Sequence, residues 1–101
     1  MNQEAVPLKD RVLAALQEVI DPETGIDVVR MRLIENLEAG SDGRVRYTFH
    51  PSSPFCPMAV YLALQIKAAV KMVPGVVDQQ IVVEGYIEQE KLTQLINKED
   101  Q

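Results

Sequence analysis

The sequence predicts an α+β fold, a two-layer α/β sandwich in which helices cover one face of a small, mixed, three-stranded sheet. Two observations predict it. The spacing of apolar residues switches between helical and strand periods in the order α-β-β-α-β-α. The strand–helix–strand part of this order is a crossover, which places the third strand in the same sheet as the first two.

Length and composition indicate one domain. The chain has 101 residues, of which 47% are hydrophobic and 25% charged, as in ordinary globular proteins. We expect a single domain over residues 1–101 with a core of about residues 8–97. The polar ends, MNQEAVP and NKEDQ, are expected to fray.

The first element is a helix over residues 8–20, because its apolar side chains fall on one face and its polar side chains on the other. The segment DPETG, residues 21–25, follows it. A proline disfavours helical backbone for the residue before it, so the helix should end near Asp21.

Two strands are predicted next, over residues 28–37 and 44–50, where apolar and polar residues alternate. A short loop with two glycines joins them, which favours an antiparallel hairpin. Strand parity places pairs of arginines on single faces, and we interpret them as a solvated surface rather than a docking patch for an acidic protein: Arg30, Arg32, Arg44 and Arg46.

The second helix, over residues 58–72, is apolar around most of its circumference. Pro57 suits its first turn, where a missing N–H costs nothing. One sheet face covers only one stripe of a helix, so the surplus indicates burial on two sides or a self-association surface. A third strand is expected within residues 76–85 and a short last helix over residues 89–97.

The charge, the apolar runs and the cysteine content indicate which partners and which location to expect. The net charge is −5 at pH 7, which argues against nucleic acid as a partner, because neutralising phosphates needs a basic surface. No apolar run is long enough to span a membrane. A single cysteine cannot form an intramolecular disulfide, and we expect a reducing, cytoplasmic location.

That cysteine, Cys56, lies in the loop HPSSPFCP just before the second helix. A thiol at a helix N-terminus ionises more readily, and thiolates bind soft metals and iron–sulfur clusters. Ser52 and Ser53 could offer hydroxyls to the same helix end. Spacing alone favours the alternative that Cys56 is a small buried hydrophobe. A metal or cluster at Cys56 would need further ligands from His50, a carboxylate, a second subunit or a partner protein.

The DPETG turn adds two carboxylates, Asp21 and Glu23. On physical grounds they are a helix stop. The functional alternative is that this rigid turn presents a carboxylate beside the Cys56 loop. His50 is interpreted as a solvent-facing strand residue, and a small thiol or hydrolytic enzyme built on Cys56 and His50 lacks a third catalytic group.

These segments together resemble the SufT/PaaD-like metal–sulfur cluster biosynthesis domain family. The likeness covers roughly residues 8–84 and is carried by the Asp-Pro-Glu turn after the first helix and the Ser-x-x-x-Cys-Pro loop before the second. The family's reactive cysteine falls on Cys56, its acidic turn on residues 21–23, and its small hydroxyl residue on Ser52.

The resemblance implies a compact α/β fold, often dimeric, and a role in assembling or delivering iron–sulfur clusters as a carrier or adaptor rather than an enzyme. It implies a transient iron–sulfur cluster or iron bound by Cys56, with Asp21, Glu23 and Ser52 at the same site. Client apoproteins or other assembly proteins would be the partners, with a homodimer as a further option. The alternative is a metal-free adaptor that docks a client protein.

The sequence departs from the family pattern in three places, which indicates a divergent branch. Arg30-Met31-Arg32 stands where many members have Asp-Leu-Gly, and Phe55 stands where glycine often precedes the cysteine. Gly85-Tyr86-Ile87 replaces a Pro-Trp feature after the third strand.

Overall fold

The computed structural model describes residues 6–98, and the polar ends expected to fray lie largely outside this range. Six elements follow one another as α1 (Leu8–Leu16), β1 (Ile34–Ala39), β2 (Arg44–Phe49), α2 (Ala59–Lys71), β3 (Asp78–Val83) and α3 (Gln89–Lys98). The predicted order α-β-β-α-β-α is confirmed. The predicted last helix, residues 89–97, corresponds to α3, which extends one residue further to Lys98.

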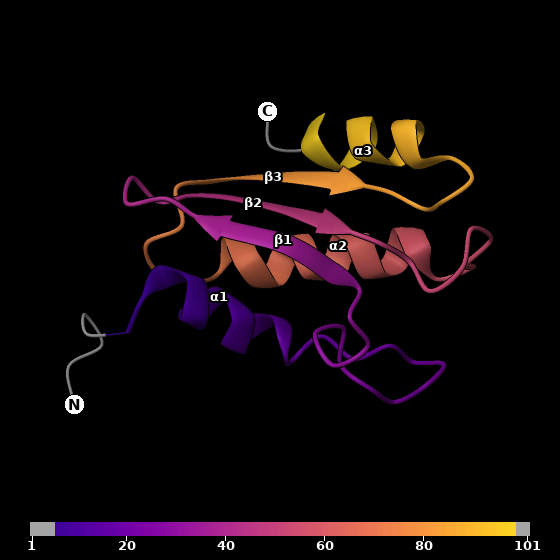
Figure 1. Cartoon of the computed structure of the whole chain (residues 1–101), viewed down its shortest axis with the longest axis horizontal. Helices are drawn as coiled ribbons and strands as arrows, with labels where there is room; N and C mark the ends of the chain where they lie inside the picture. Colours follow the sequence, from indigo (N-terminus) through magenta and orange to yellow (C-terminus); the bar gives the residue numbers. More distant parts are fainter. Residues whose placement is uncertain (1–5, 99–101) are drawn as a thin grey trace.

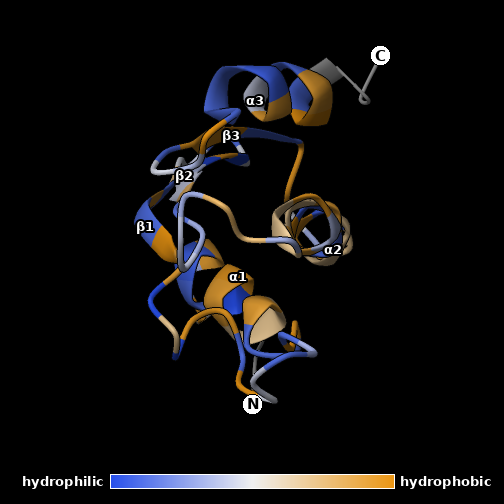
Figure 2. Ribbon diagram, turned by 90° about the vertical axis from the view of Figure 1, so that its right-hand side faces the viewer, coloured by the Kyte–Doolittle hydropathy of each residue, from blue (hydrophilic) through white to orange (hydrophobic). Residues whose placement is uncertain are grey.

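The three strands form one mixed sheet in the order β1-β2-β3, as predicted. β1 is antiparallel to β2, and β2 is parallel to β3. The connection from β2 to β3 passes through α2, because a parallel pair needs a crossover. α2 lies opposite the sheet, while α1 lies beside β1 and α3 beside β3 (Figures 1 and 2).

The core lies between the sheet and the helices. Alternate residues of β2 and β3 are buried: Val45, Tyr47, Phe49, Ile81 and Val83. α2 contributes its buried stripe, which includes Leu62 and Ile66. The opposite, polar face of the sheet exposes Arg44 and Arg46, so the predicted pairing of these two arginines on one face holds.

The predicted start of the first strand is wrong. Residues 28–32 form a turn, in which the Met31 N–H donates to the Asp27 carbonyl oxygen at 3.0 Å. The Asp27 carboxylate also accepts from the Arg30 N–H at 2.9 Å, and Arg32 has a φ of 61°. Side-chain capping by Asp27 thus favours a turn over a strand, so Arg30 and Arg32 do not share a strand face.

The first helix is also shorter than predicted. It ends at Leu16, and the chain continues in tighter turns, with the Val19 N–H donating to the Leu16 carbonyl oxygen at 3.1 Å. Val19 is buried whereas Ile20 is exposed and forms an isolated bridge with Asp27. Within residues 6–98, no helix combines the length and the apolar character that crossing a bilayer would need.

Candidate functional site

Three loops meet at one end of the molecule, where β2 and β3 both end (Figures 1 and 2). They connect α1 to β1, β2 to α2, and β3 to α3. The His50 N–H donates to the Leu33 carbonyl oxygen at 2.8 Å, and the Ile87 N–H donates to the Pro54 carbonyl oxygen at 2.9 Å. Carboxyl ends of parallel strands are where α/β proteins commonly bind ligands, so this end holds the candidate site.

Cys56 lies in the middle loop, two residues before Met58, the N-cap of α2. Its backbone meets the helix end, since the Ala59 N–H donates to the Cys56 carbonyl oxygen at 3.3 Å. Its side chain belongs to the hydrophobic core and only 5% of the residue is exposed. This burial agrees with the alternative that spacing alone favoured, a small buried hydrophobe, and not with a thiolate that is accessible from solvent. The neighbouring Phe55, by contrast, is 72% exposed.

The serines of this loop do not cap α2, contrary to expectation. The N-cap residue Met58 makes no side-chain hydrogen bond to the helix. The Ser53 hydroxyl oxygen instead accepts from the Phe55 N–H at 3.2 Å and so stabilises the turn that leads into Cys56. Ser52 is exposed. Pro57 precedes the N-cap rather than lying in the first helical turn, because α2 begins at Ala59.

The acidic turn holds its own loop together. Asp21 is 2% exposed, and its Oδ1 accepts from the Glu23 N–H at 2.8 Å. The Asp21 carbonyl oxygen accepts from the N–H of Gly25 at 2.8 Å, and Gly25 has a φ of 72°. Glu23 is exposed. Across residues 6–98, no hydrogen bond or ion pair joins either carboxylate to the Cys56 loop.

His50 faces solvent, in line with the preferred interpretation. Its Nδ1 lies 3.6 Å from Glu35 Oε2, and the side chain is 46% exposed. The ring covers Gly85, since a Cβ added to Gly85 would lie 2.2 Å from His50 Nε2. The sequence did not predict this contact between His50 and Gly85. Its one hint was a glycine at position 85, where a residue without a side chain leaves room for a neighbour.

The part of the chain that the structure describes contains no cluster of three or more His, Cys, Asp or Glu side chains able to hold a metal ion. Cys56 is the only thiol in the chain. A tetrahedral metal site or an iron–sulfur cluster takes about four ligands, so this chain alone offers an incomplete set.

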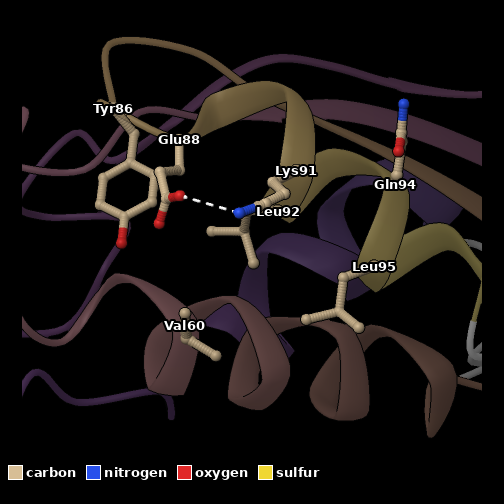
Figure 3. A pocket seen from close by; sticks show the side chains of 7 residues that line it. All are labelled: Val60, Tyr86, Glu88, Lys91, Leu92, Gln94 and Leu95. Carbon is tan, nitrogen blue, oxygen red and sulfur yellow. Dashed lines mark hydrogen bonds and ion pairs between the residues drawn. The ribbon is translucent and has the colours of Figure 1, made fainter.

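An apolar groove lies next to these loops, between the N-terminal half of α2 and α3 (Figure 3). Its volume is about 440 Å³. Seven side chains line it: Val60, Tyr86, Glu88, Lys91, Leu92, Gln94 and Leu95. The sequence predicted that the second helix is buried on two sides or forms a self-association surface. It did not predict this groove, because the groove depends on where α3 packs.

Residues 9–83 match the model of a family described as iron-sulfur cluster assembly protein. The chain belongs to this family. The matched span contains both the acidic turn and the Cys56 loop, which confirms the resemblance found in the sequence.

Named relatives of this assembly-family chain include two kinds of protein. An Fe-S protein maturation auxiliary factor of Bacillus subtilis is 32% identical over 74 residues, which are 73% of this chain and 72% of that protein. An iron-sulfur cluster carrier protein of Deinococcus radiodurans is 36% identical over 75 residues, which are 73% of this chain but only 21% of that protein. The match to the carrier protein therefore spans about a fifth of its length.

A solved structure shows the same fold. The crystal structure of a domain of unknown function from Bacillus anthracis superposes with a TM-score of 0.70 at 25% identity and covers 91% of this chain and 90% of that one. The α-β-β-α-β-α architecture is therefore shared with a solved protein.

Proposed function

We propose that this chain assembles or delivers iron–sulfur clusters as a carrier or adaptor in the cytoplasm, without catalysing a reaction of its own. Family membership and the names of the relatives support the role in cluster assembly. The observation that carries the finer proposal is the position of the only thiol. Cys56 lies in a loop at the carboxyl ends of two parallel strands, where three loops meet.

In this proposal the cluster, or iron, is cargo, and Cys56 supplies one sulfur ligand to it. The other ligands come from the client apoprotein, from another assembly protein or from a second copy of this chain. Glu23 offers an exposed carboxylate and Ser52 an exposed hydroxyl, whereas Asp21 holds the shape of its turn.

Because Cys56 is buried, the loop must move to present its sulfur. Pro54, Phe55 and Pro57 around it are exposed, so few packing contacts oppose such a movement. The hydrogen bond from the Ile87 N–H to the Pro54 carbonyl oxygen is one tie that opening would break.

A second candidate is a metal-free adaptor that docks a client protein. The observation that favours it is the 5% exposure of Cys56 in a chain whose residues 6–98 include no metal-binding cluster. In that function Cys56 is a small core hydrophobe.

Anaerobic reconstitution with iron and sulfide separates these candidates. We expect the wild-type protein to acquire visible charge-transfer absorption and bound iron, and the Cys56→Ser and Cys56→Ala variants to lose both. Alanine is included because a serine hydroxyl in the core carries its own desolvation cost, of about 1–3 kcal/mol. Circular dichroism confirms that each variant is folded.

The matched control is Ser53→Ala, which changes the same loop but leaves the thiol. It should load iron like the wild type. Equal loading of wild type and both Cys56 variants, or no loading of any, would contradict cluster carriage by Cys56 and favour the metal-free adaptor.

A further inference from the structure

The loop that carries Cys56 has little anchorage apart from the cysteine itself. Within residues 52–57, Cys56 is the only buried residue, and the other five are exposed. The Cys56 N–H donates to the Ser53 carbonyl oxygen at 3.2 Å, a bond inside the loop. Among residues 6–98, a single hydrogen bond ties residues 52–57 to a distant segment, from the Ile87 N–H to the Pro54 carbonyl oxygen at 2.9 Å. This one bond therefore joins the loop to the rest of the candidate site.

The segment that supplies this bond connects β3 to α3, at the same end of the molecule (Figure 1). We call residues 85–87 the strap. Gly85, at its start, has a φ of 73° and lies against the His50 ring. Ile87, at its end, donates to Pro54. Since His50 and Pro54 both belong to the connection from β2 to α2, the strap contacts that connection at two points.

The strap is exposed, but the backbone on either side of it is regularly hydrogen-bonded. Ile87 is 63% exposed. Before the strap, the Glu84 N–H donates to the Phe49 carbonyl oxygen at 3.1 Å and extends the pairing of β3 with β2. After it, the Leu92 N–H donates to the Glu88 carbonyl oxygen at 3.0 Å, as in a helix. A segment with few buried contacts between two such elements opens locally more readily than the elements themselves.

Two routes can expose a buried thiol, unfolding of the whole molecule or local opening of its loop. Unfolding breaks the sheet and the core together. Local opening breaks the bond to Pro54 and moves one small side chain out of the core, while Pro51 and Ala59, the buried residues that flank the loop, keep their places. Local opening therefore disrupts far fewer contacts than unfolding does.

We propose that the strap controls access to Cys56. It holds the loop closed through Pro54, and the thiol becomes accessible when strap and loop separate while the rest of the molecule stays folded. That this access serves the transfer of a cluster or iron rests on the proposed function. The opening itself does not depend on that function, because it involves only the thiol, its loop and the strap.

The test is the rate at which iodoacetamide alkylates Cys56 in the full chain without iron, followed by mass spectrometry. Where this rate is proportional to the iodoacetamide concentration, it reports the fraction of molecules that are open. We expect the folded wild type to react at least about tenfold more slowly than the chain unfolded in urea. Low urea concentrations should leave the wild-type rate unchanged, because local opening exposes little surface.

Ile87→Pro removes the N–H that bonds Pro54. Ile87 is the second residue of a turn that the Gln89 N–H closes on the Tyr86 carbonyl oxygen at 3.1 Å, and proline fits this position. The variant should keep the turn and be alkylated about threefold to tenfold faster than the wild type. Ile87→Ala is the matched control, since it shortens the side chain but keeps the N–H, and it should react like the wild type. Circular dichroism confirms that both variants are folded.

Gly43→Ala separates local opening from unfolding. Gly43 lies in the turn between β1 and β2 at the opposite end of the molecule (Figure 1). Its φ of 90° and the backbone beside it mean that alanine there destabilises the whole fold. Alkylation by local opening should keep its wild-type rate in this variant. Acceleration by about tenfold or more would show exposure through unfolding and overturn the proposal.

Amide hydrogen exchange tests the strap in the wild type, without any substitution. If the strap must separate before the thiol is exposed, the Ile87 amide opens at least as often as Cys56. A thiol that opens more often than the Ile87 amide would overturn the proposal. So would equal alkylation of wild type and Ile87→Pro, or equal acceleration by Ile87→Ala and Ile87→Pro.

The outcomes for the strap and for the proposed function are distinguishable, because iron is absent from these measurements. Expected alkylation rates with no cluster loading would overturn the proposed function and leave the strap in place. Loading that depends on Cys56, with equal alkylation of wild type and Ile87→Pro, would overturn the strap alone.

Discussion

Gly85 lies against the ring of His50 at the end of β3, and two separate constraints act on it. Its φ of 73° is in the left-handed region, which glycine adopts at little cost. In addition, any side chain there meets the imidazole, because an added Cβ would lie 2.2 Å from Nε2. Gly25 has nearly the same φ of 72°, but nothing lies within 4 Å of an added Cβ.

This pair predicts a difference in stability. Gly85→Ala should lower the free energy of unfolding by about 2–4 kcal/mol, since backbone strain and a steric clash add. Gly25→Ala should cost only the strain, about 1–2 kcal/mol. Urea unfolding followed by circular dichroism measures both.

Removing the His50 ring separates the cost of backbone strain at Gly85 from the cost of the steric clash. In a His50→Ala background, Gly85→Ala should cost about as much as Gly25→Ala. If Gly85→Ala costs the same with and without the His50 ring, the contact is not what makes glycine necessary there.

At the same scale, the sequence named Cys56, Asp21, Glu23 and Ser52 as one site, and this stays a prediction. Asp21 was predicted to stop the first helix, but α1 already ends at Leu16, and the Asp21 carboxylate instead closes the turn that follows. Spacing alone favoured a buried Cys56, but only packing with residues distant in the chain could decide its burial.

At the scale of elements, α3 protects the outer edge of β3. Asn97 donates to the Ile81 carbonyl oxygen at 2.8 Å and accepts from the Ile81 N–H at 3.1 Å, as a neighbouring strand would. One turn earlier, the Thr93 hydroxyl oxygen accepts from the Val83 N–H at 2.9 Å. Lys67 of α2 also donates to the Ile96 carbonyl oxygen near the C-terminal end of α3. Side-chain hydrogen bonds to β3 and α2 thus hold α3 in place, in addition to the burial of its apolar side chains.

Loss of these bonds should loosen α3. We expect Asn97→Ala and Thr93→Val each to lower the free energy of unfolding by about 1–2 kcal/mol, because an edge N–H loses its acceptor. Amide hydrogen exchange of Ile81 and Val83 should accelerate in the corresponding variant. The control is Gln94→Ala on the exposed side of the same helix, which should change neither quantity, and equal effects of all three variants would contradict the edge contact.

The elements themselves were predicted well, and their boundaries less so. Helical and strand periods are local properties of the sequence, so their order was correct. In β1, Asn36 has a φ of 55° and the register shifts between Glu35 and Glu38, which marks a β-bulge. The alternation of apolar and polar residues over residues 28–37 predicted one regular strand. In the structure, residues 28–32 form a turn and the bulge interrupts β1.

The two ends of the molecule differ: one carries the Cys56 loop, and the other carries the turn between β1 and β2. Opposite the Cys56 loop, the turn between β1 and β2 packs against the connection from α2 to β3 (Figure 1). The Val77 N–H donates to the Gly43 carbonyl oxygen at 2.8 Å, and a Cβ on Gly43 would lie 2.5 Å from the Gly75 carbonyl oxygen. The molecule is 42 Å long, so this contact lies far from the Cys56 loop. We expect it to affect the stability of the fold and not the candidate site.

Gly43→Ala should therefore lower the free energy of unfolding by about 2–4 kcal/mol, through a φ of 90° and the clash with backbone. Below its unfolding temperature, the variant should still load iron in the anaerobic reconstitution to the wild-type level. Combined with Gly85→Ala, the two costs should add within about 0.5 kcal/mol, as for distant sites. A loss of iron loading by folded Gly43→Ala would instead show that the two ends are coupled.

The sequence by itself determined the order and type of the elements, the mixed sheet, the family, and the loop and turn that could serve its function. These features follow from residue spacing and short motifs, which are local. Only the tertiary structure decided that the Cys56 thiol is buried, that His50 covers Gly85, and that a groove lies between α2 and α3. Each of these depends on contacts between residues far apart in the chain, whose geometry no local pattern specifies.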